Sequence, residues 1–102
     1  MLTTAAYTDL ENYVKARIGS AEYEVNGVWY SAVIVESVIM DDGTVRIKCQ
    51  ISPNQVCTIT GVRVKNTDGQ PWATKEVNVE IESAATHLLQ WFDFLFSESE
   101  VN

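Results

Sequence analysis

The chain has 102 residues, a length that suits one domain with a single hydrophobic core and is too short for two. Its 46% of apolar residues are spread along most of the sequence, which excludes disorder for the bulk of the chain. The formal net charge is −7 and the seven basic residues are scattered, so nucleic acid and anionic membranes are disfavoured as partners.

The first predicted element is a helix over about residues 4–18. Thr4 can cap it, and its apolar positions fall every four residues, at Ala6, Leu10, Val14 and Ile18. Gly19 is expected to end the helix in the left-handed conformation. This segment lacks the continuous apolar stretch of a signal peptide, and no run in the chain approaches the roughly 20 apolar residues of a membrane span. We therefore expect a soluble protein made in the cytoplasm.

From residue 22 the apolar period changes from near four to two, which predicts strands. Asn26-Gly27 lies between the strand-forming residues 22–25 and 28–30 and is a strong hairpin signal. The run over 32–40 is rich in β-branched residues at both parities. It predicts a central strand that is covered on both faces for part of its length.

A turn at 41–43 precedes a half-buried strand over 45–51, which Ser52-Pro53-Asn54 ends. In the following strand the apolar parity changes between Ile59 and Val62. A bulge at Gly61 would restore the register.

After a turn at 66–69, alternation over 77–82 predicts a further strand. The apolar segment 87–96 fits a helix or a strand, and its aromatic content and length favour a strand. Residues 98–102 are expected to fray. The sum is a single α+β domain over 1–102, with one helix before an antiparallel, hairpin-built sheet of six or seven strands, or a small sandwich, in a strand-rich region over 21–97.

Two cysteines, Cys49 and Cys57, are separated by seven residues, a spacing that matches neither a metal site nor a redox motif. We interpret them as small buried hydrophobic residues. A cross-strand disulfide stays open as an alternative if the turn at Pro53-Asn54 brings them together.

Catalytic and cofactor signals are weak. His87 is the one histidine, and no nucleophile motif accompanies it. Asp41, Asp42 and Asp68 lie in turns without the spacing of a calcium loop, and the glycines stand singly, so no phosphate-binding loop is present. The sequence predicts a protein that is not an enzyme and that has neither a cofactor nor a metal.

The aromatic residues are numerous for this length. Segment 88–96 is apolar at both parities, so a strand there would be covered on both faces, either by the core and another subunit or wholly within the monomer. The candidate interface residues are Trp29, Trp72, Trp91, Phe92, Phe94 and Phe96.

The order of features over residues 45–98 resembles small proteins of bacteriophage and prophage tail regions, such as tail-collar and tail-fibre segments. An alternating strand leads into Ile51-Ser52-Pro53-Asn54, and Thr58-Ile59-Thr60-Gly61 then leads through Val62-Arg63-Val64-Lys65 to Asn66-Thr67-Asp68-Gly69. The resemblance implies a virion or assembly component without catalytic residues, often a homo-oligomer. It transfers no site residue.

Two hypotheses follow for function. The first is a structural protein of a phage or prophage tail, found in the virion or in the bacterial cytoplasm during assembly, that packs against itself or other tail proteins. The second is a monomeric module that binds a glycan or a peptide through exposed aromatics such as Trp29, Tyr30 or Trp72.

Overall fold

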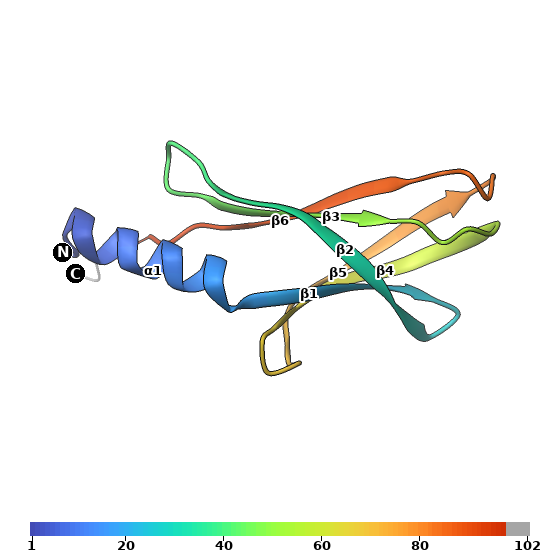
Figure 1. The fold of residues 1–102 in the computed structure, drawn as a ribbon, viewed down its shortest axis with the longest axis horizontal. Coiled ribbons are helices and arrows are strands. Elements are labelled where there is room, and N and C mark those ends of the chain that lie inside the picture. Colours follow the sequence, from blue (N-terminus) through green and yellow to red (C-terminus); the bar gives the residue numbers. More distant parts are fainter. Residues whose placement is uncertain (98–102) are drawn as a thin grey trace, which may run out of the picture.

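The computed structural model describes residues 1–97 and places them in one helix and six strands (Figure 1). The elements are α1 (Thr4–Arg17), β1 (Ile18–Val25), β2 (Val28–Ile39), β3 (Val45–Ile51), β4 (Cys57–Asn66), β5 (Pro71–Ile81) and β6 (Leu88–Phe94). The predicted α+β class, with an N-terminal helix before an antiparallel sheet, is confirmed. The expectation for residues 98–102 lies outside the described residues.

The two ends of α1 differ in detail from the prediction. The hydroxyl of Thr3 accepts a hydrogen bond from the N–H of Ala6 at 3.2 Å, so Thr3 is the N-cap and not Thr4. The expected left-handed stop at Gly19 is wrong, because the chain turns extended at Ile18 and enters β1 directly. Gly19 instead makes room for a close neighbour, since an added Cβ would lie 3.2 Å from the Cα of Thr67.

The turn between β4 and β5 holds the end of α1. The carbonyl of Arg17 accepts a hydrogen bond from the N–H of Thr67 at 2.9 Å, which satisfies one carbonyl at the end of the helix. The Arg17 guanidinium donates to the Thr67 hydroxyl at 2.7 Å and to the Asp68 carboxylate at 2.9 Å. The helix is thereby fixed at one end of the sheet.

All six strands belong to one sheet in the order β5-β4-β1-β2-β3-β6, and each neighbouring pair is antiparallel. The sheet curls until it is nearly closed into a barrel, so a single curled sheet takes the place of the sandwich alternative. β5 and β6 are its two edges and flank the opening.

Two local signals of the sequence have the expected effect. Asn26 and Gly27 have φ values of 53° and 78°, and the hairpin they form pairs Val25 with Val28. The pairing of β4 with β5 shifts register between Ile59 and Gly61, which confirms the place of the irregularity, although the extra residue lies on β5, between Glu76 and Val79, and not at Gly61.

The connection between β3 and β4 is not a hairpin. β3 pairs with β2 and β6, whereas β4 pairs with β1 and β5, so the two strands are not neighbours in the sheet. The thiols of Cys49 and Cys57 are both free. Cys49 is buried in the core and Cys57 is half-buried against it, so the disulfide alternative gives way to the interpretation as apolar packing residues.

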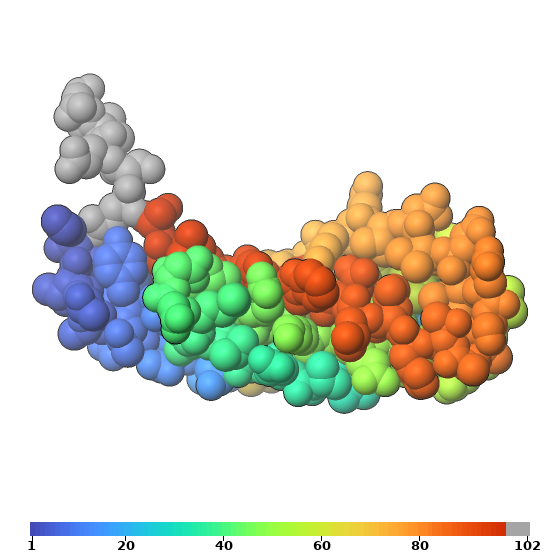
Figure 2. Space-filling view, turned by 90° about the horizontal axis from the view of Figure 1, so that it is seen from above, coloured from blue at the N-terminus to red at the C-terminus, as the bar shows by residue number. Residues whose placement is uncertain are grey.

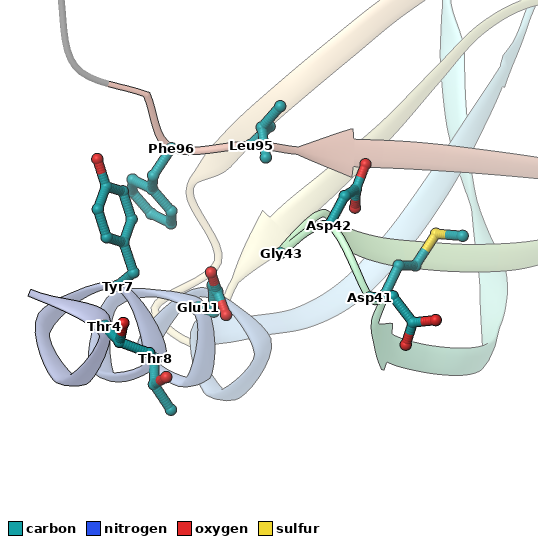
Figure 3. Close-up of a pocket in the computed structure, with 10 residues that line it drawn as sticks. Thr4, Tyr7, Thr8, Glu11, Asp41, Asp42, Gly43, Leu95 and Phe96 are labelled. Atoms are coloured by element: carbon teal, nitrogen blue, oxygen red, sulfur yellow. The ribbon is translucent and has the colours of Figure 1, made fainter.

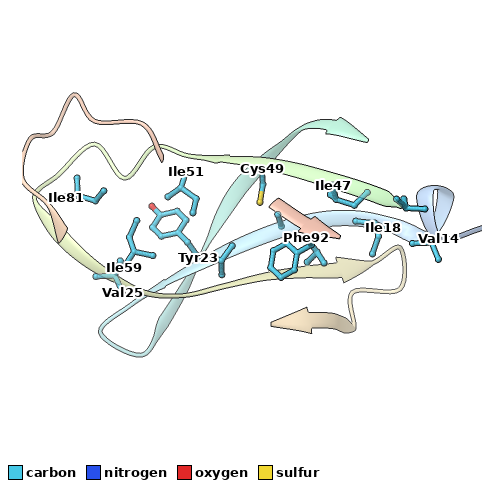
Figure 4. Close-up of a cluster of buried hydrophobic side chains, with 14 residues drawn as sticks. Val14, Ile18, Tyr23, Val25, Ile47, Cys49, Ile51, Ile59, Ile81 and Phe92 are labelled. Carbon is cyan, nitrogen blue, oxygen red and sulfur yellow. The ribbon is translucent and has the colours of Figure 1, made fainter. Parts of the chain in front are cut away.

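The hydrophobic core fills the inside of the curled sheet (Figure 4). Its buried members are Val14, Ile18, Ala21, Tyr23, Val25, Val45, Ile47, Cys49, Ile51, Ile59, Val62, Val64, Ile81 and Phe92. Val14 is the buried residue that α1 contributes, at the end of the barrel where the helix joins β1. β2 adds the partly buried Ala32, Ile34 and Ile39, so the inner faces of all six strands share one core.

The prediction for β2 is half correct. The strand is central, between β1 and β3, as expected. The expected cover on both faces is wrong, because Val33 and Val35 are 63% and 49% exposed. In a curled sheet of one layer the outer face is open to solvent, so apolar residues at both parities mark an apolar exterior here and not a second core.

The segments near the C-terminal end also differ from their predictions in length. Residues 88–94 form β6, so the strand interpretation of the ambiguous aromatic segment is confirmed. β5 begins at Pro71 and not near 77 as predicted; its proline is tolerated because β5 is an edge strand.

Among residues 1–97, no helix has both the length and the apolar character needed to cross a membrane.

Candidate interaction surface

The exterior of β2, β3 and β6 is a continuous surface on one side of the barrel (Figure 2). Ile47 and Phe92 are opposite one another and point into the core, so the next pair, Lys48 and Trp91, points outwards. The pairing makes three cross-strand rows: Val33, Gln50 and Leu89; Glu36, Lys48 and Trp91; and Val38, Arg46 and Asp93. We call these nine residues, together with Val35, the outer face.

A bulge adds Val35 to this surface. The register of β2 against β3 shifts between Ile34 and Glu36, so Val35 is an extra residue without a partner on β3. Its side chain is exposed beside that of Glu36.

Four apolar side chains of the outer face are exposed. Val33 is 63% exposed, Leu89 54%, Val35 49% and Trp91 46%. A hollow of about 350 Å³ overlaps the outer face at Glu36, Val38, Arg46 and Lys48, and its further lining residues are Ile39, Met40 and Asp41. Adjacent exposed apolar residues with a polar rim are typical of an interaction site.

The charges of the outer face are paired with one another. Arg46 donates two hydrogen bonds to the Asp93 carboxylate, both at 2.8 Å, and its guanidinium lies 5.5 Å from the ring centroid of Trp91. The bond from Arg46 lowers the pKa of Asp93 below its ordinary value. Lys48 Nζ lies 3.6 Å from Glu36 Oε2. The charges of these four ionised groups cancel, so the outer face carries no net charge.

Only one of the six aromatic residues predicted for an interface belongs to the outer face, and it is Trp91. Phe92 is 6% exposed and is part of the core, because it points inwards opposite Ile47. Phe94 and Phe96 are half-buried against the core. These three phenylalanines therefore pack against the core and lie outside the outer face.

The other two predicted residues lie elsewhere on the barrel. Trp29 on β2 is half-buried over Gly61, and the guanidinium of Arg63 lies 4.1 Å from its ring centroid. Trp72, at the start of β5, is 37% exposed and has its ring centroid 6.3 Å from that of Tyr13 on α1. The structure thus does not gather the tryptophans into one site.

His87 forms a contact that the sequence did not indicate. Its Nδ1 lies 2.7 Å from the Ser52 hydroxyl oxygen and 3.4 Å from Gln50 Nε2. A hydroxyl beside an imidazole is the start of a nucleophile–base pair, which also needs a group to orient the base. Within residues 1–97 no carboxylate is hydrogen-bonded to this imidazole, and neither His87 nor Ser52 lines a described pocket. The pair joins the exposed ends of β3 and β6.

A pocket of about 440 Å³ lies between α1, the turn after β2 and the segment after β6 (Figure 3). Tyr7 and Phe96 form an aromatic wall, and Glu11 comes close to Gly43, where an added Cβ would lie 2.7 Å from the Glu11 carboxylate oxygen. The further lining residues are Thr4, Thr8, Met40, Asp41, Asp42 and Leu95. Its carboxylates give the pocket a negative potential.

These carboxylates are not arranged as a metal site. Asp42 accepts a hydrogen bond from the N–H of Thr44 at 2.9 Å, which lowers the pKa of its carboxyl group. In Figure 3 Asp41 and Asp42 point to different sides of the turn. Asp68, the third aspartate that the sequence places in a turn, is instead paired with Arg17. For the part of the chain that the structure describes, no three His, Cys, Asp or Glu side chains are placed to hold a metal ion.

The sequence did not single out Val33, Val35 and Leu89, which are exposed on the outer face. Their signal was present in the apolar residues at both parities of β2 and β6. For β2 this pattern was interpreted as cover on both faces, and for β6 as cover by another subunit or burial within the monomer.

In comparisons with protein-family models, with curated proteins and with solved structures, no match is found for this chain.

Proposed function

We propose that this chain is a non-catalytic structural or assembly protein of a phage or prophage tail region, which works by packing against copies of itself or against other tail proteins. The observation that carries the proposal is the exposed apolar surface of Val33, Leu89 and Trp91 on a barrel that already has a filled core. The sequence resemblance over residues 45–98 supports the tail assignment.

The packing role is supported by the cost of leaving such a surface in water. Burial of apolar area contributes about 25 cal/mol per Å², so exposed side chains of this size favour association. Two of them, Leu89 and Trp91, lie on the edge strand β6, where one row of backbone groups has no strand partner in the sheet. A partner that covers this surface gains apolar contacts.

Quantitative mass spectrometry of purified tail particles from a host that carries the gene tests the tail assignment. The expected result is a fixed number of copies per particle, well above the carry-over of an abundant soluble host protein measured in the same preparation. Absence from particles and from assembly intermediates, in a lysate that contains the protein, would contradict the proposal.

A second candidate function is a monomeric module that binds a glycan, and the Tyr13–Trp72 pair favours it. The two rings are tilted by 40° with centroids 6.3 Å apart, and both are exposed. Exposed aromatic rings stack on the apolar faces of sugars. Titration of tryptophan fluorescence with a panel of glycans, with Trp72→Ala as the comparison, tests it; an unchanged signal for every glycan would remove this candidate.

A further inference from the structure

We infer that the outer face binds the same face of a second copy of this chain, in a two-fold symmetric dimer. The inference rests on the proposed packing function and names the partner for that surface. It follows from the position of three exposed apolar side chains, Val33, Leu89 and Trp91. They lie beside two acidic and two basic side chains that pair with one another.

The first argument is electrostatic. The chain carries a net charge of −7, so two copies repel one another over most of their surfaces. Strands β2, β3 and β6 contain two acidic residues, Glu36 and Asp93, and two basic residues, Arg46 and Lys48. The charges of these strands therefore sum to zero, so a second acidic copy meets less repulsion on this side of the barrel than on an acidic side.

The second argument concerns what kind of partner fits. Arg46 and Asp93 satisfy one another through two hydrogen bonds, and Lys48 lies beside Glu36. A strongly basic or strongly acidic partner would gain little from groups that are already paired, and it would bury its own charges against Val33 and Leu89. A partner face that is equally apolar and equally neutral fits best, and the outer face itself has these properties.

The third argument is symmetry. A two-fold contact needs a surface that is complementary to itself, with each residue type on one copy meeting a compatible type on the other. In the outer face the apolar side chains lie on the two flanking strands, at Val33 and Val38 on β2 and at Leu89 and Trp91 on β6. Rotation about an axis along β3 places β2 of each copy against β6 of the other, so that Val33 of each copy faces Leu89 of the other.

A pair of charge reversals tests the inference by sedimentation velocity in the micromolar range. Glu36→Lys gives the outer face a charge of about +2, and Lys48→Glu gives it about −2. The dimer dissociation constant of each variant alone should therefore be about tenfold higher than that of the wild type. In an equimolar mixture the two faces attract, and association should return to near the wild-type level. Circular dichroism and thermal melting confirm that both variants fold, since the exposed Lys48–Glu36 pair contributes little stability.

Matched controls separate the surface from the total charge. Glu80→Lys on β5 and Lys15→Glu on α1 change the net charge by the same amounts at exposed positions away from the outer face. Both should associate like the wild type.

Any one of three results would overturn the inference. The wild-type protein could stay monomeric, the charge-reversal variants could associate as the wild type does, or the equimolar mixture could fail to recover association. A monomeric protein that is nevertheless present in tail particles leaves the proposed function intact and assigns the outer face to a different tail protein. If the protein is absent from tail particles but still dimerises through this face, only the tail assignment is refuted.

Discussion

Lys75 on β5 donates a hydrogen bond to the main-chain carbonyl of Trp91 on β6. The two strands are the opposite edges of the sheet, so this bond crosses the opening of the barrel. The same ammonium lies 4.8 Å from the ring centroid of Phe92 in the core. An inward-pointing lysine on an edge strand also discourages pairing with strands of other molecules.

Replacement of Lys75 by methionine should weaken the closure of the barrel. The variant keeps the length of the side chain but loses the charged donor, and the expected loss is about 1–2 kcal/mol of unfolding free energy. Urea unfolding measures the loss, and hydrogen exchange should become faster in β6 before it does so in β1. Lys15→Met on the exposed surface of α1 is the control. Equal stability of Lys75→Met and wild type would show that the bridge between the edges contributes nothing.

Asp93 should make stability depend on pH. Its pKa is lowered in the folded protein, first by the hydrogen bond from Arg46, so it binds protons more weakly when folded than when unfolded. The stabilisation is therefore complete above the ordinary value of 3.8 and is lost as the pH falls through the lowered folded-state pKa.

The measurement compares the wild type with Asp93→Asn. At neutral pH the variant should be less stable by less than about 1 kcal/mol, because the pair is partly exposed. Below pH 3.8 the difference should shrink towards zero. Asp9→Asn serves as a control on the surface of α1. A difference between wild type and Asp93→Asn that grows on acidification would contradict the assigned sign.

Local signals were sufficient for much of the fold. Asn26-Gly27 requires positive φ at two successive residues, and alternation over 45–51 fixes which residues of β3 point inwards, so both elements follow from neighbouring residues alone. The α+β class rests on the same kind of local pattern.

The candidate surface depends on contacts between distant residues, and these could not be predicted from local pattern. β6 pairs with β3 across more than 35 residues of sequence, and this pairing puts Trp91 beside Lys48 and Leu89 beside Gln50. The parity of β2 allowed two interpretations, a strand covered on both faces or an apolar exterior. Only the strand order and the curl of the sheet decide between them, and neither is encoded in the alternation of one strand.

Cys49 should react with thiol reagents much more slowly than Cys57. Burial raises the pKa of the Cys49 thiol and excludes reagent, whereas Cys57 is half-buried. The single-cysteine variants Cys57→Ser and Cys49→Ser, treated with a chromogenic disulfide at mildly alkaline pH, should differ in rate by about tenfold or more. In urea the two rates should converge. Equal rates in the native protein would mean that the core around Cys49 opens readily.

Trp29 and Gly61 should be energetically coupled through direct contact. A Cβ at position 61 would lie 3.0 Å from Cη2 of Trp29, and Trp29 cannot withdraw freely because Arg63 stacks on its ring at 4.1 Å. Gly61→Ala should therefore cost about 1–3 kcal/mol, as overpacking does elsewhere. In a Trp29→Ala background the added methyl group meets no indole, and the cost should fall by more than half. Urea unfolding of the four proteins of this double-mutant cycle gives the coupling energy directly. Additive effects of the two substitutions would show that the indole does not impose the glycine at position 61. The Glu24 side chain, 3.3 Å from the same added Cβ, would then be the stricter constraint.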